Sequence, residues 1–100
     1  LDQPSTTYNS LFERLADRSL RPADESMDQA RLTTMVRDEV SKLPQRERRI
    51  IENRFGLDGR EALTFHDLGE VLGLSRERAR QLEREALRRL RKRLQRALTV

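Results

Sequence analysis

Hydrophobic residues recur at spacings of three and four along most of the chain, and no segment alternates between apolar and polar residues with a period of two. The first spacing marks one face of an α-helix, and the second would mark a half-buried strand. The pattern therefore predicts an all-α fold, a small bundle of short helices without a sheet.

An amphipathic helix is predicted for residues 25–42. Its expected inward positions recur mostly at spacings of three and four residues: Ala30, Leu32, Met35, Val36, Val40 and Leu43. Pro44 ends this helix, because proline lacks the backbone N–H that a helix interior needs, and it suits the first turn of the next one. In that second helix the buried stripe is expected to be Ile50, Ile51 and Phe55, and Gly56 stands where a C-terminal cap belongs.

A helix-turn-helix is predicted from "TFHDLGEVLGLSRERARQLE", residues 64–83. Thr64 is a helix N-cap with an acidic residue three positions later. Gly69 allows close contact between helices and Gly73 allows a tight turn. A short helix, a turn containing glycine and a second helix make up this motif. The expected inward positions are Leu68, Leu72, Leu74, Ala79 and Leu82. An ordinary helical hairpin is the alternative, but it would not need this combination of two glycines and apolar positions around the turn.

The first 24 residues carry two prolines, scattered Ser and Thr, and one apolar cluster of Leu11, Phe12 and Leu15. We expect an extended linker there, with about one helical turn. The predicted organisation is thus a linker over residues 1–24 and a helix-turn-helix domain over residues 25–98. The chain does not begin with Met, so we expect it to be a piece of a longer protein.

The distribution of charge along the chain indicates what kind of partner it binds. The net charge is +4, and residues 76–100 hold ten basic and three acidic side chains. A concentration of one sign indicates a polyanionic partner, although a solvated helix end would look the same. The absence of cysteine favours a reducing, cytoplasmic compartment. No apolar run reaches the length of a membrane span. No catalytic or metal-ligand constellation is present, so we expect neither an enzyme nor a cofactor.

The direction of the arginines in residues 76–96 refines the prediction. An α-helix advances about 100° per residue, so with Arg76 at zero, Arg80 lies near ~40°, Glu77 near ~100° and Gln81 near ~140°. The apolar positions of the same helix fall on the opposite side. Arg can bind guanine, Gln can pair with adenine and Glu can accept from cytosine, so Arg76, Glu77, Arg80 and Gln81 are candidates for base reading in the major groove.

The later cations are too far along the helix to reach bases and suit phosphates or a partner protein: Arg84, Arg88, Arg91 and Lys92. A coiled coil is the alternative for this segment, but it needs an apolar heptad repeat sustained over three or four heptads. The spacing here drifts towards successive fours, so we do not expect one.

Three blocks, "RFGLDG", "GEVLGLSRER" and "RQLEREALRRLR", make residues 43–92 resemble region four of bacterial sigma factors of the primary, housekeeping type and their close relatives. Residues 1–42 resemble the family's linker between its third and fourth domains, followed by the first helix of the fourth. The resemblance implies a domain that binds the promoter −35 element while docked on the β-subunit flap of RNA polymerase, in the bacterial nucleoid.

The resemblance also implies residue roles. Base contacts would come from Arg76, Glu77, Arg80 and Gln81, in agreement with the helix geometry. The DNA backbone would be contacted by Arg46, Arg54, Thr64, Phe65 and Arg78. A transcription activator would meet Arg84, Arg88, Arg89 and Arg91, and Phe55 would lie near the flap.

His66 stands in "FHD" where the family has Leu-Glu-Glu. It is expected to be a solvent-facing residue at the helix start, with a phosphate contact as the alternative, and a lone His without Cys argues against metal. Two other functions remain open. One is a protein-interaction module that docks an activator or an anti-sigma factor through the basic C-terminal helix, and the other is the output domain of an unrelated helix-turn-helix regulator.

Overall fold

The computed structural model describes residues 4–16, 20 and 27–98, and all regular elements within them are helical. In chain order they are α1 (Pro4–Leu15), α2 (Gln29–Ser41), α3 (Gln45–Phe55), the 3-10 turn η1 (Leu57–Gly59), α4 (Phe65–Leu72) and α5 (Arg76–Leu98). The predicted all-α fold is confirmed.

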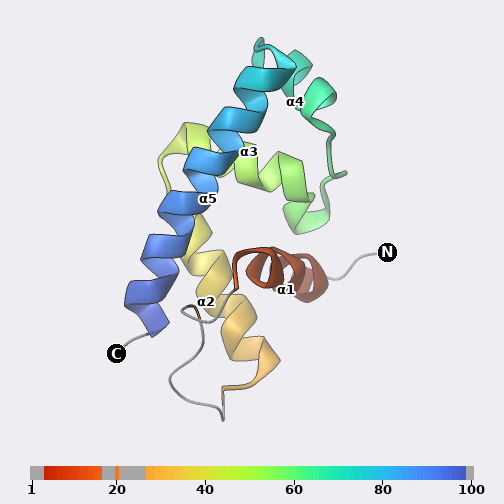
Figure 1. The fold of residues 1–100 in the computed structure, drawn as a ribbon. Helices are drawn as coiled ribbons and strands as arrows, with labels where there is room; N and C mark the ends of the chain where they lie inside the picture. The colour runs from red at the N-terminus through yellow and green to blue at the C-terminus, as the bar shows by residue number, and fades with distance from the viewer. Residues whose placement is uncertain (1–3, 17–19, 21–26, 99–100) are drawn as a thin grey trace.

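The long helix α5 is the axis of the molecule. Its 23 residues span about 35 Å at 1.5 Å per residue. Figure 1 shows α4 against the N-terminal half of α5, α2 beside its C-terminal half, and α3 between them. This arrangement places the helix-turn-helix at one end of the molecule and α1 and α2 at the other.

Two apolar clusters hold the helices together. We call the smaller one the turn cluster, and it joins α3, α4 and α5 through Ile50, Leu68, Ala79 and Leu82. The larger one, the base cluster, joins α1, α2, η1 and the C-terminal half of α5, and includes Leu11, Phe12, Val36, Leu57, Leu90 and Leu94. Ile50 and Ile51 are both fully buried, and α3 contributes one to each cluster.

The ends of α2 and α3 are fixed by local chemistry. Asp28 caps α2, because its Oδ1 accepts a hydrogen bond of 2.8 Å from the backbone N–H of Arg31. The predicted start of this helix at residues 25 and 26 lies outside the described residues. Gly56 ends α3 in the left-handed conformation, with φ 65°, as predicted for a C-terminal cap.

The expectation of an extended segment with one helical turn before residue 24 is wrong for Pro4–Leu15, which forms a helix of 12 residues. Sequence reasoning counted Leu11, Phe12 and Leu15 but missed Tyr8, which completes an i, i+3, i+4, i+7 stripe. All four side chains are buried in the base cluster, where α1 lies against α2 and η1. The helix forms because tertiary packing, rather than local propensity, stabilises it. The division of the chain at residue 24 stays a prediction.

Candidate nucleic-acid interface

The turn between α4 and α5 is built as the sequence predicted. Thr64 caps α4, with its Oγ1 accepting a 3.1 Å hydrogen bond from the backbone N–H of Asp67. Gly73 ends α4 in the left-handed conformation, with φ 71°. The backbone N–H of Leu74 donates to the carbonyl of Gly69 across 2.7 Å. A Cβ at Gly69 would lie 2.6 Å from the Leu74 carbonyl oxygen, so this position requires glycine.

The turn sets the direction of α5. Ser75 begins the helix, because its Oγ accepts a hydrogen bond of 3.0 Å from the backbone N–H of Arg78. Ala79 and Leu82 are buried in the turn cluster. Sequence reasoning missed the cap at Ser75, although a serine three residues before the bonded N–H is its usual signal.

The four candidate base-reading residues are brought together on the outer face of the first two turns of α5. They are all exposed: Arg76, Glu77, Arg80 and Gln81. We call this set the reading face. It lies opposite Ala79 and Leu82, as the helix geometry predicted. A packed core on one side and exposed side chains on the other are what direct readout from a major groove requires.

The reading face is internally paired in the absence of a partner. Arg80 donates from NH2 to Oε1 of Glu77 across 2.7 Å and from Nε to Oε2 across 3.2 Å. The hydrogen bond from Arg80 lowers the pKa of Glu77, with the charges of Arg80, Arg76 and Arg84 acting in the same direction. Gln81 accepts a weaker bond of 3.3 Å from Arg78. Exposed pairs of this kind are weak and exchange easily for contacts to a ligand.

The side chain of Arg54 is half-buried and is held by contacts within the domain. Its Nε donates to Oε2 of Glu83 across 2.8 Å, and its NH1 donates to the carbonyl of Leu63 across 3.0 Å. Its guanidinium also stacks over the ring of Phe65, 4.2 Å from the centroid. Glu83 is buried, and sequence reasoning missed it as the partner of Arg54. The predicted backbone contact of Arg54 therefore competes with three internal contacts.

The remaining predicted backbone contacts differ in exposure. Arg46, Thr64 and Arg78 are exposed, whereas Phe65 is half-buried beneath Arg54. Thr64 and Arg78 lie in the two helix starts on either side of the turn, and Arg46 lies in the first turn of α3. Phe55, the predicted flap contact, is half-buried and packs against the base cluster.

Two polar grooves run along α5 beyond the reading face. A groove of about 570 Å³ is lined by Gln81, Arg84, Glu85 and Arg88. A second groove, of about 680 Å³, is lined by Lys42, Pro44, Glu85, Arg88, Arg89, Lys92, Arg93 and Arg96. Of the predicted partner contacts, Arg84, Arg88 and Arg89 line these grooves and Arg91 does not. Arg89 also pairs with Glu47 across 2.8 Å, so α3 holds part of the groove in place.

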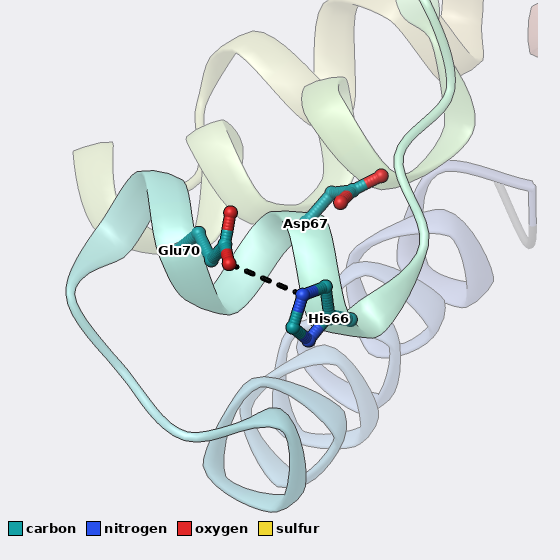
Figure 2. Close-up of side chains that lie close together, drawn as sticks. All are labelled: His66, Asp67 and Glu70. Atoms are coloured by element: carbon teal, nitrogen blue, oxygen red, sulfur yellow. Dashed lines mark ion pairs between the residues drawn. The ribbon is translucent and has the colours of Figure 1, made fainter.

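His66 lies at the start of α4 and is exposed, as predicted. Figure 2 shows it facing Glu70 one turn later, with 3.1 Å between Nε2 and Oε1. Within the described residues, His66, Asp67 and Glu70 form a group whose potential ligand atoms lie within 4.8 Å of one another. All three are exposed, and exposed acidic groups of this kind are common without a metal.

In the described part of the chain, no helix is long and apolar enough to cross a membrane.

Comparison with known proteins gives a family match over residues 40–92, described as Sigma-70, region 4. The chain is 40% identical over 74 residues to "RNA polymerase sigma factor sigF, chloroplastic" of Arabidopsis thaliana, which covers 74% of this chain and 14% of that protein. It is 40% identical over 73 residues to "RNA polymerase sigma factor SigA" of Bacillus sp, covering 73% of this chain and 19% of that protein. The chain thus spans less than a fifth of each of these relatives. No solved structure matches it significantly.

Proposed function

Since the chain belongs to the sigma-70 region 4 family, a family of DNA-binding initiation factors and not of enzymes, we propose that it is a promoter-recognition module for the −35 element. In this proposal the first two turns of α5 enter the major groove, and the domain acts as part of an RNA polymerase holoenzyme in the bacterial cytoplasm, at the nucleoid. Both named relatives are RNA polymerase sigma factors by their names.

The observation that carries the proposal is the reading face. Its residues offer three different hydrogen-bonding patterns on two helical turns: Arg76, Glu77, Arg80 and Gln81. A surface that only attracted phosphates would have no use for the carboxylate of Glu77, which repels them. A carboxylate among guanidinium groups fits base reading, because it can accept from the amino group of cytosine.

The backbone contacts follow from the same docking. Thr64 and Arg78 lie at the starts of α4 and α5, and helix N-termini bind phosphate favourably. In a helix-turn-helix complex the first helix crosses the DNA backbone while the second lies in the groove. Arg46 is exposed and free of the internal contacts that hold Arg54, so of the two arginines in α3 it is the better phosphate ligand.

Docking on the polymerase is the second part of the proposal. Phe55 is the last residue of α3 and packs against the base cluster, not against the turn cluster that contains Ala79 and Leu82. An apolar contact there leaves the reading face free for DNA. We therefore propose the β-subunit flap as the partner of the face that includes Phe55.

Selection of bound DNA sequences by the chain assembled with polymerase core tests the proposal. We expect enrichment of one short sequence, and a preference relaxed at one or two base pairs when Gln81 or Arg76 is replaced by alanine. Enrichment that is identical for the wild type and both variants would remove the reading-face assignment. Because one small module buries limited DNA surface, the chain alone is expected to bind only weakly.

A second candidate function is favoured by the groove of about 680 Å³. Its cations come mostly from the C-terminal half of α5, and Lys42, which follows α2, also lines it. Such a groove suits an acidic segment of an activator or an anti-sigma factor, with DNA contact secondary. Substitution at Glu77 or Gln81 would then do little, whereas Arg88→Ala would abolish regulator binding.

A further inference from the structure

The helix α1 packs on the rest of the domain in the same way that an amphipathic helix of one protein docks in a hydrophobic groove of another. Tyr8, Leu11, Phe12 and Leu15 occupy positions i, i+3, i+4 and i+7 of α1, and their exposed fractions are 1%, 0%, 3% and 8%. This is the anchor spacing by which amphipathic helices are recognised in hydrophobic grooves. Figure 1 shows α1 lying beside α2, and α1 also lies close to η1.

Polar contacts fix α1 at specific points around these anchors. The hydroxyl of Tyr8 donates to Oδ2 of Asp58 across 3.0 Å, and Thr33 Oγ1 donates to Oδ1 of Asn9 across 2.9 Å. Arg37 lies over the ring of Tyr8, 6.0 Å from its centroid. These partners come from η1 and α2, far from α1 in sequence. The contacts therefore define one docked position rather than a loose apolar collapse.

The surface beneath α1 is apolar and lies partly within the family domain. Directly against α1 it is formed by α2 and η1, and the same cluster continues into the C-terminal half of α5; its members include Leu32, Val36, Val40, Leu57, Leu90 and Leu94. Phe55, the proposed flap contact, packs against the same cluster. The family match covers residues 40–92, so α1 lies outside the matched part while it covers apolar residues within it.

We infer that the apolar surface beneath α1 is a helix-binding groove, and that α1 is its intramolecular occupant, which an amphipathic helix of RNA polymerase displaces. The inference rests on the proposed polymerase docking and adds a regulatory step to it. The incoming helix is one with apolar anchors at i, i+3, i+4 and i+7, because α1 shows that the groove accepts that spacing. Only molecules in which α1 is undocked can then bind polymerase. The apparent affinity is therefore the affinity of the undocked form multiplied by the fraction of molecules in that form.

A reversible disulfide tests this step. The chain contains no cysteine, so Asn9→Cys and Thr33→Cys together create a single possible bond between α1 and α2. The side-chain oxygens of these two residues are 2.9 Å apart, so the two side chains are in direct contact when α1 is docked. The oxidised form holds α1 in the groove, and the reduced form of the same protein is its matched control. Circular dichroism establishes that both forms are folded.

Binding to RNA polymerase core is then measured for the oxidised form, the reduced form, the wild type and each single-cysteine variant. We expect the oxidised form to bind at least tenfold more weakly, and the other proteins to bind alike. Equal binding of the oxidised and reduced forms would overturn the inference while leaving polymerase docking intact.

A second measurement uses the unmodified chain. Amide hydrogen exchange in α1 should accelerate when polymerase core is added, because displacement exposes its backbone, while the amides of α2 stay protected. Slower or unchanged exchange in α1 upon binding would contradict displacement. If the wild type and the reduced form do not bind core at all, the proposed docking fails and displacement by polymerase fails with it.

Discussion

Arg54 in α3 and Glu83 in α5 form an ion pair beneath the reading face, with 2.8 Å between Nε and Oε2. The side chain of Glu83 is 4% exposed and that of Arg54 is 31% exposed. A buried carboxylate needs such a partner, because an unpaired charge in the interior is strongly destabilising. The pair therefore couples α5, the proposed reading helix, to α3.

Replacement of Arg54 by alanine should destabilise the domain. We expect a loss of about 2–3 kcal/mol in the free energy of unfolding, below the range for a fully buried pair because Arg54 is partly exposed. Urea denaturation measures it. Arg46→Ala, an exposed arginine of the same helix, is the matched control and should leave stability unchanged. If Arg54 also contacts a phosphate, its replacement will reduce the salt dependence of DNA binding by about one charge.

Gly69 and Gly73 should respond differently to alanine. At Gly69 the added methyl group meets the Leu74 carbonyl oxygen at 2.6 Å, so the turn must move; we expect a cost of about 2 kcal/mol. At Gly73 no atom lies within 4 Å, and only the φ of +71° opposes a side chain, for about 1 kcal/mol. Thermal unfolding of both variants compares these costs. A larger loss for Gly73→Ala would show that backbone conformation, not close approach, dominates the turn.

Single substitutions on the reading face should change base preference. Arg76→Ala and Gln81→Ala are each expected to relax specificity at one or two base pairs, by roughly 1–3 kcal/mol. Sequence selection with the holoenzyme provides the measurement. Lys92→Ala is the control, because Lys92 lies four turns beyond Arg76 and lines the second groove instead. An altered base preference in Lys92→Ala would contradict the division of α5 into reading and non-reading parts.

Tyr8 should lose its hydroxyl proton at a higher pH than an ordinary tyrosine. Burial, the hydrogen bond to Asp58 and the negative charge of that carboxylate raise the pKa of Tyr8 to about 12, and Glu52 adds to this while Arg37 opposes it. The folded state thus holds the proton more tightly than the unfolded state. Stability from this group is complete below pH 10, and is lost as the pH rises towards 12.

The chain has one tyrosine, so ultraviolet absorbance of tyrosinate reports Tyr8 alone. We expect a midpoint well above the ordinary value of 10 in the folded chain, and a return to that value in urea. Tyr8→Phe should remove the corresponding alkaline loss of stability. An ordinary midpoint in the folded chain would mean that α1 does not bury Tyr8 in solution.

Helix positions and the turn were predictable because they depend on neighbours in sequence. The cap at Thr64, the left-handed Gly56 and Gly73, and the buried stripe containing Ala79 and Leu82 follow from local rules and are confirmed. The exposure of the reading face follows from the same periodicity, since the face opposite a buried stripe points to solvent. Its role in base reading stays a prediction.

Contacts between residues far apart in the sequence could not be predicted from these local rules. The sequence by itself determined that the chain is helical, where its turn lies and which face of α5 is polar. Only the tertiary structure decided that Arg54 pairs with Glu83 instead of pointing outwards, and that Tyr8 makes Pro4–Leu15 a docked helix. Helical periodicity is a property of residues three or four apart, whereas a buried ion pair and a docked helix depend on which surfaces meet after the chain has folded.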